Sequence, residues 1–149
     1  MNPMRRLAPL VLAAIVASGC ATGTDLSANA RQAVESGTSF GMCGGYCETQ
    51  LVVDGSQATL IEMARNRELP DRSRTIELSA AEQSRFYAAV DTAAVRRLAG
   101  VHGCPDCADG GAEWIEVGDA RVTFDFGKEL AGIAPLQREI RALRARFPR

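Results

Sequence analysis

The feature that most constrains the fold is a predicted β-hairpin formed by residues 112–117 and 120–126. The two-residue turn between them begins with glycine, which suits a type II′ turn. Pairing across this turn sets apolar residues opposite each other on one face and opposite charges on the other face: Ile115 with Val122, and Glu116 with Arg121. One register therefore satisfies both a buried face and a solvent face, which predicts a hairpin packed on one side against a core.

A second hairpin is predicted earlier in the chain, where residues 48–53 and 57–63 flank Asp54-Gly55-Ser56. Asp-Gly between two apolar runs is a strong hairpin signal. The turn places four apolar residues on one face: Leu51, Val53, Ala58 and Leu60. The polar, arginine-rich residues 66–75 that follow are interpreted as a loop.

Helix signals follow each hairpin. Ser79 and Glu82 match a capping box, in which each side chain bonds the other residue's backbone N–H, and they predict a helix over residues 80–90. A short helix over residues 93–98 follows, with Thr92 as its cap. Pro135 suits the first turn of a terminal helix, whose apolar residues recur at helical spacing: Leu136, Ile140, Leu143 and Phe147.

The predicted order of elements is hairpin, helix, hairpin, helix. This order indicates an α+β fold in which an antiparallel sheet built from two β-hairpins has helices packed on one face. Residues 20–37 are rich in small and polar side chains without a lasting apolar period, so we interpret them as a flexible tether. Residues 38–149 are then the single folded domain.

The N-terminus has the features of an export signal. Arg5 and Arg6 precede an apolar run over residues 7–17, and small residues follow it. The run is about half of the ~20 residues that cross a bilayer, which disfavours a spanning anchor. Residues 1–19 are therefore predicted to be a cleaved signal peptide.

Cys20 directly follows this signal, and Ala17-Ser18-Gly19-Cys20 resembles the bacterial lipobox. The resemblance implies that Cys20 is the first residue of the mature protein and carries fatty acyl groups such as palmitate. Ala21 is not the aspartate that commonly retains such lipoproteins at the inner membrane. The resemblance therefore implies a lipid-anchored protein on the periplasmic face of the outer membrane.

Charge narrows the class of partner. The whole chain has a net charge of −1, and removal of the signal with Arg5 and Arg6 makes the mature chain more acidic. Such a balance argues against nucleic acid as a partner. The membrane, reached through the lipid anchor, and an unidentified envelope protein or polymer are the partners we expect.

Four cysteines remain after Cys20 is used for the anchor: Cys43, Cys47, Cys104 and Cys107. An even number of thiols in an exported protein favours two disulfides, because the bacterial periplasm is oxidising. Gly44-Gly45 lets the chain fold back between the first two cysteines, and Pro105-Asp106 suits a turn between the second two. Crosswise pairing would close a longer loop and stabilise the fold by about 4 kcal/mol, against ~2 kcal/mol for a local pair.

Two other uses of these thiols stay open, and both define the alternative function. In the first, Cys43, Cys47, Cys104 and Cys107 bind zinc or a softer metal ion, with His102 as a further ligand. In the second, Cys104-Pro105-Asp106-Cys107 acts in thiol redox chemistry, although such sites need the first cysteine at a helix N-terminus. The disulfide interpretation needs no cofactor, and the metal interpretation needs zinc.

The order of elements, together with Cys43-Gly44-Gly45-Tyr46-Cys47 directly ahead of a strand, resembles the bacterial domain of unknown function numbered 6438. The family is often found in exported lipoproteins and has no established activity, so the resemblance implies a fold order and a location. It also favours local disulfides, since family members can carry the first cysteine pair alone. The insertion at residues 102–111 departs from the family pattern.

No sequence signal favours catalysis. His102 is the only histidine, and no nucleophile-elbow motif accompanies it. Other binding candidates are the arginines at positions 65, 67, 72 and 74, which suit an anionic polymer, the aromatic pair Tyr46 and Trp114, and the acidic residues Asp106, Asp109 and Glu113, which suit calcium. We therefore expect a non-catalytic envelope protein that binds a partner or acts structurally.

Overall fold

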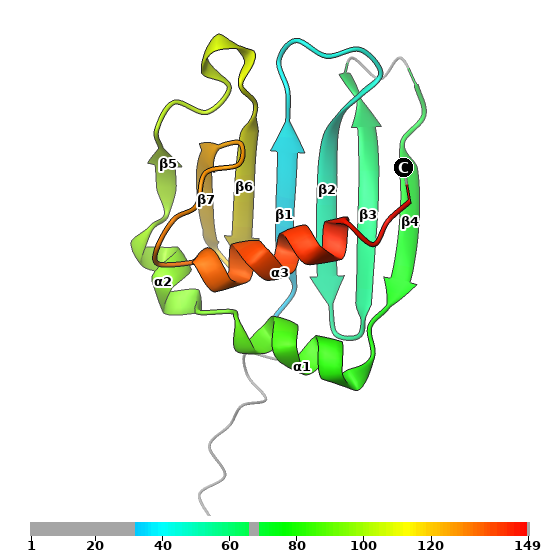
Figure 1. Cartoon of the computed structure of the whole chain (residues 1–149), viewed down its shortest axis with the longest axis vertical. Coiled ribbons are helices and arrows are strands. Elements are labelled where there is room, and N and C mark those ends of the chain that lie inside the picture. Colours follow the sequence, from blue (N-terminus) through cyan, green and yellow to red (C-terminus); the bar gives the residue numbers. More distant parts are fainter. Residues whose placement is uncertain (1–31, 66–68, 149) are drawn as a thin grey trace, which may run out of the picture.

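The protein is a seven-stranded mixed sheet with helices on one side, seen in a computed structural model that describes residues 32–65 and 69–148 (Figure 1). The spatial order of the strands is β4-β3-β2-β1-β6-β7-β5. All neighbouring strands pair antiparallel except β5 and β7, which are parallel. The strands are β1 (Val34–Ser39), β2 (Tyr46–Asp54), β3 (Gln57–Ala64), β4 (Arg72–Glu77), β5 (Gly100–His102), β6 (Ala112–Val117) and β7 (Ala120–Asp125).

Helices α1 (Ala80–Ala88), α2 (Thr92–Arg97) and α3 (Ala134–Arg144) share one buried cluster with a single face of the sheet. Figure 1 shows α3 crossing the middle of this face, while α1 and α2 lie along the end of the sheet where β1 begins. A short 3-10 turn, η3 (Cys107–Asp109), lies in the loop before β6. None of the helices in the described part of the chain is long and apolar enough to cross a membrane.

Both predicted hairpins and the α1 cap are confirmed. Strands β6 and β7 pair in the predicted register, and in the β2–β3 hairpin Leu51 pairs with Leu60 and Val53 with Ala58. Ser79 and Glu82 form both bonds of the capping box. The four apolar residues of the terminal helix are buried, so the coarse prediction of an α+β fold with helices against one sheet face holds: Leu136, Ile140, Leu143 and Phe147.

The simple order hairpin, helix, hairpin, helix is wrong, because three further strands complete the sheet. Residues 72–77 form β4, although residues 66–75 were predicted as a loop from their polarity. An edge strand tolerates such polar residues, since one of its sides stays in water. The segment between α2 and β6 also contains the short strand β5. Helix α2 begins at Thr92, and its N-cap is Asp91 rather than the predicted Thr92.

The central strand β1 corrects the predicted domain boundary. It begins at Val34, inside the segment 20–37 that composition assigned to the tether, so the domain begins before residue 38. The sequence Val-Glu-Ser-Gly-Thr-Ser has little apolar area of its own, and its place between β2 and β6 provides the burial. Gly37 is essential there, because a Cβ at this position would overlap the indole of Trp114. The signal peptide and Cys20 lie outside the described residues.

Candidate functional site

The helix-side face of the sheet changes from apolar to polar along its central strands. Residues that alternate along a strand point to the same face, so the change can be followed within each strand. In β2, Val53 and Leu51 are buried in the core, and Thr49 follows on the same face. The other central strands show the same change in this order: Val34, Ser36 and Thr38 in β1, Ala58, Leu60 and Glu62 in β3, and Val117, Ile115 and Glu113 in β6.

Because the pairing register aligns these strands, their polar residues lie at the same end of the sheet. Thr38 pairs with Thr49 on one side and with Glu113 on the other. The hydroxyls of Thr38 and Thr49 are 2.7 Å apart. Thr49 in turn pairs with Glu62. This is the end of the sheet opposite the point where β1 enters (Figure 1). We call this end of the helix-side face the polar half. We call the opposite end, which lies beneath α1 and α2, the dry half.

Helix α3 has two stripes that face the sheet. One is the apolar stripe named above, and the other contains Gln137, Arg141 and Arg144 at spacings of four and three residues, which places them on one side of a helix. Gln137 is 2 % exposed, and its amide joins the β7–α3 loop by donating to the carbonyl of Lys128 and accepting from the N–H of Leu130. The second stripe thus brings two arginines over the polar half.

A pocket of about 690 Å³ opens over the polar half. Its polar lining comes from five strands and from α3, and its apolar lining comes mainly from the rings of Phe40, Phe126 and Phe147. The charged and aromatic residues of the lining are Glu62, Arg74, Glu113, Arg141, Arg144, Phe40, Phe126 and Phe147. Ligand sites typically measure about 300–1,000 Å³ and combine an apolar lining with a few convergent polar groups, so the pocket has the size and lining of a ligand site.

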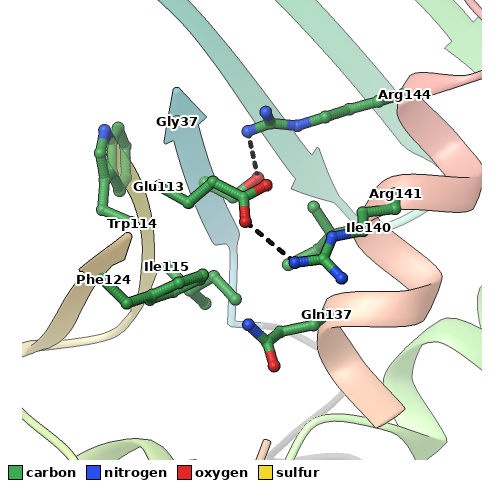
Figure 2. A pocket seen from close by; sticks show the side chains of 10 residues that line it. Gly37, Glu113, Trp114, Ile115, Phe124, Gln137, Ile140, Arg141 and Arg144 are labelled. Carbon is green, nitrogen blue, oxygen red and sulfur yellow. Dashed lines mark hydrogen bonds and ion pairs between the residues drawn. The ribbon is translucent and has the colours of Figure 1, made fainter. Parts of the chain in front are cut away.

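Glu113 lines this pocket on the α3 side, and together with Arg141 and Arg144 it also lines the small adjoining pocket that Figure 2 draws. Its side chain is largely buried, and its Oε2 accepts from Arg141 Nη2 at 3.0 Å and from the N–H of Gly127 at 3.2 Å. Arg141 Nη2 also lies 3.2 Å from the carbonyl of Lys128. The bond to Glu113 and the contact with Lys128 hold Arg141 in place at the pocket wall.

Arg144 is held differently, because no carboxylate accepts from it among the described residues. Figure 2 shows it reaching from α3 toward β1, where its Nη2 donates to Ser36 Oγ at 3.0 Å. Its Nε is buried and has no hydrogen-bond partner. Burial lowers the pKa of the Arg144 guanidinium, and the nearby Glu113 carboxylate opposes that shift. An arginine has five N–H donors, so this guanidinium has donors to spare beside the pocket.

A third arginine reaches the pocket from the β4 side. Arg74 Nη2 and Glu62 Oε2 form an ion pair at 2.9 Å, and Arg74 Nη1 also donates to the carbonyl of Pro148. This second bond ties the segment after α3 to the sheet. Arg74 and Glu62 therefore neutralise each other at one wall of the pocket. Glu113 and Arg141 form the ion pair at the other wall.

The two cysteine pairs close loops at the same end of the sheet as the pocket. Cys43 and Cys47 are at disulfide distance with Cα atoms 5.6 Å apart, and Cys104 and Cys107 likewise at 5.5 Å. The pairs are local rather than crosswise. Asp106 joins the two loops, because its Oδ1 accepts from the N–H of Gly41 at 3.1 Å and of Gly111 at 3.2 Å.

These loops also position the aromatic rim of the pocket. Phe40 directly precedes the first cysteine loop, and its ring packs edge-on against Phe126 with centroids 4.8 Å apart. The N–H groups of Asp106 and Phe126 both donate to the carbonyl of Gly111, which connects the second loop to the same rim. The cysteine pairs therefore lie in the framework of the pocket mouth.

The remaining predicted site residues lie apart from the pocket. His102 is on β5, where its Nε2 is 2.6 Å from the carbonyl of Leu98. In the described ranges, no three His, Cys, Asp or Glu side chains lie close enough together to hold a metal ion. Of the acidic residues that could bind calcium, Asp106 accepts from backbone amides and Glu113 accepts from Arg141. The zinc alternative stays a prediction that a thiol count tests.

The aromatic and arginine candidates divide between the two faces. Arg72 lies over the ring of Tyr46 at 4.2 Å, and Arg121 over Trp114 at 3.8 Å. Trp114 is on the face away from the helices, so it does not share a surface with the pocket. Of the arginines suggested for an anionic polymer, Arg74 is the one that lines the pocket, and residue 67 lies outside the described chain.

Sequence reasoning named Arg74 and Glu113 as binding candidates, but in other roles, and it gave no role to Arg141, Arg144 or Glu62. The sequence did contain a signal for these residues. On one face of β3 and of β6, the alternating apolar residues are followed by a glutamate, Glu62 or Glu113, at the same end of the sheet. Only the register between non-adjacent strands shows that these charges meet.

Comparisons with known proteins add no family. A scan against protein-family models finds no matching family, and a search of curated proteins finds no significant match. The resemblance to the domain numbered 6438 stays a prediction.

Proposed function

We propose that this protein is a lipid-anchored, non-catalytic binding domain of the bacterial envelope, and that the pocket over the polar half holds its ligand. The observation that supports this proposal is the change of polarity on one sheet face. A face that served folding alone would continue its apolar series, because burying charged groups is costly unless they are paired and hydrogen-bonded. Here Glu62 of β3 and Glu113 of β6 lie at the same end of the sheet, and three arginines line the same pocket.

The position of the pocket suits an anchored protein. If Cys20 carries the lipid, the chain up to Val34 spans at most about 50 Å when fully extended. Strand β1 then enters the sheet at the dry end, and the pocket is at the opposite end (Figure 1). Attachment at the dry end leaves the pocket end of the domain free to meet envelope components.

The two disulfides serve the pocket in this proposal. Each closes a short loop, so each contributes about 2 kcal/mol or less by constraining the unfolded chain. Their position matters more than their stabilisation, because the two loops meet through Asp106 and carry the aromatic rim. In an oxidising compartment these loops keep the rim in place without an extended core beneath it.

In-cell photocrosslinking tests the proposal. Phe126 is 47 % exposed at the pocket rim, and Val101 is 70 % exposed on β5, away from it. Each is replaced in turn by p-benzoylphenylalanine in the full chain, and cells are irradiated. We expect an adduct at position 126 and none at 101. Equal labelling at both positions, or none at either, contradicts a ligand pocket.

Two measurements separate the other parts of the proposal. Membrane fractionation of Cys20→Ala is expected to show release from the membrane fraction, and retention contradicts the lipid anchor. Mass spectrometry of unreduced protein is expected to show no free thiol among Cys43, Cys47, Cys104 and Cys107. Four alkylatable thiols with about one bound metal ion would instead establish the metal alternative, and a readily reducible Cys104 pair alone would establish the redox alternative.

A further inference from the structure

We infer that the pocket ligand carries a single carboxylate joined to an apolar, ring-sized group, and that Arg144 is the residue that binds the carboxylate. This inference rests on the proposed function and specifies the chemistry of the same pocket. Three independent features lead to it: the charge balance of the lining, the unused donors of Arg144, and the aromatic rim.

The charge balance indicates one negative charge on the ligand. Glu62 pairs with Arg74, and Glu113 pairs with Arg141, so two of the three arginines lining the pocket are already neutralised. Arg144 is left with a hydroxyl as its partner among the described residues. One further anionic group balances the pocket, whereas a dianion would meet Glu62 and Glu113 without a second free cation.

The geometry of Arg144 favours a planar carboxylate. A guanidinium binds a carboxylate through two parallel N–H···O bonds, and such charge-assisted bonds are about twice as strong as neutral ones. One bond to Ser36 leaves the two N–H groups of Nη1 and one of Nη2 without a partner among the described residues, while the Nε is buried. Desolvation already lowers the pKa of this guanidinium, so an arriving anion would supply the compensation that the protein alone does not.

The rest of the ligand is apolar. Phe40 and Phe126 form the edge-to-face pair at the mouth, and Phe147, which is 5 % exposed, forms part of the wall on the α3 side. Leu60 also lines the pocket, two residues before Glu62 on the same face of β3. A pocket of about 690 Å³ accommodates a substituted ring between these side chains.

The test uses the full mature chain in lipid nanodiscs and fluorine NMR of 4-fluorophenylacetate, with empty nanodiscs as the blank. The matched neutral probe is 4-fluorophenylacetamide, which keeps the ring and loses the charge. We expect the acid to bind at least about tenfold more tightly than the amide, as for a charge-assisted pair. Equal affinity for acid and amide, or tighter binding of the dianion 4-fluorophenyl phosphate, overturns the inference.

Two variants on the same helix place the carboxylate. Arg144→Met keeps the length of the side chain and removes the guanidinium, so acid affinity is expected to fall at least about tenfold while amide affinity is unchanged. Arg138→Met is the matched control, because Arg138 pairs with Glu129 away from the pocket, and it is expected to change neither affinity. Equal losses in both variants, or none in Arg144→Met, contradict the assignment.

The outcome is distinguishable from failure of the proposed function. If position 126 crosslinks in cells but the acid and the amide bind alike, the pocket is a ligand site and the carboxylate assignment is wrong. If neither position crosslinks and neither probe binds, the pocket is not a ligand site. The comparison of acid with amide is made on the unaltered chain, so it does not depend on how any variant folds.

Discussion

The two halves of the helix-side face differ in what they contribute. In the dry half, Val53, Ala58 and Val117 are at most 1 % exposed and pack beneath α1, α2 and the start of α3. Burial of such side chains contributes about 1.5–3 kcal/mol each for the larger residues. In the polar half, the same strands present hydroxyls and carboxylates to an open pocket.

The difference shows that the fold depends on only part of this face. A hydrogen bond between protein groups contributes a net ~0.5–1.5 kcal/mol, because it replaces bonds to water. Arg144 is buried with few partners, so we expect its guanidinium to cost stability rather than add to it. Regions that are held for binding commonly reduce stability in this way, so the comparison itself supports a ligand site.

The largest expected effect is the loss of a core side chain in the dry half. Leu51→Ala is expected to lower the free energy of unfolding by about 2 to 5 kcal/mol, since Leu51 is 1 % exposed and leaves a cavity. Thr49 lies two residues from Leu51 on the same face of β2. Thr49→Ala is expected to lower the free energy of unfolding by about 1 kcal/mol at most, through loss of the bond to Thr38. Urea denaturation measures both. Equal losses would remove the distinction between the two halves.

The next largest effect tests the charges of the polar half. Glu113→Gln leaves Arg141 without its carboxylate and is expected to cost about 1 to 3 kcal/mol, the range for bonds to charged groups. Glu129→Gln is the matched control, because its pair with Arg138 is exposed and 3.7 Å long, and it is expected to cost under ~1 kcal/mol. If the two variants are equally stable in urea, Glu113 does not organise the pocket.

A smaller, pH-dependent effect is expected at the start of α1, the helix over the dry half. Hydrogen bonds from the Ser79 side chain and backbone to Glu82 lower the pKa of that carboxyl, which is ordinarily 4.5. A lowered folded-state pKa adds stability that is present above the ordinary value and is lost as pH falls through the folded value. The stability gap between the unaltered chain and Ser79→Ala is therefore expected to narrow from about pH 7 to about pH 3.

This pH dependence separates the cap of α1 from the pocket, because neither Ser79 nor Glu82 lines the pocket. The affinity for 4-fluorophenylacetate at neutral pH is expected to be the same in Ser79→Ala as in the unaltered chain. Urea denaturation at both pH values measures the gap. A gap that widens on acidification contradicts the assigned role of Glu82.

The smallest effect is expected on the face away from the helices. Glu116 and Arg121 form an ion pair at 2.9 Å with both side chains partly exposed. Exposed pairs contribute about 0–1 kcal/mol, so Glu116→Ala is expected to change the free energy of unfolding by less than ~1 kcal/mol and to leave probe binding unaltered. A loss comparable with that of Leu51→Ala would show that this face is packed as well.

Local signals in the sequence predicted the elements that depend on neighbouring residues. The β6–β7 register, the turn at Gly55 and the capping box at Ser79 each depend on residues a few positions apart, and all three are confirmed. Strand β1 could not be predicted in this way, since Ser36 and Thr38 are buried only because β2 and β6 lie on either side.

The candidate site depends on the same distant contacts. Arg144 meets Ser36 across most of the folded chain, and Glu113 meets Arg141 only when α3 crosses the sheet. The cysteines were visible as a set because their number and compartment suggest pairing, but their place at the pocket mouth required the loops to meet through Asp106. Residues with strong local patterns were therefore predicted, and residues brought together by topology were not.

The free energy of unfolding of Arg144→Met, measured in urea without ligand, shows whether Arg144 serves the fold or the pocket. If the polar half is held for binding, Arg144→Met is expected to leave stability unchanged within ~1 kcal/mol or to raise it, because relief of the buried charge offsets the hydrogen bond that Ser36 loses. A loss of more than ~1 kcal/mol would show that Arg144 stabilises the fold, and would contradict the account of a pocket maintained for a ligand.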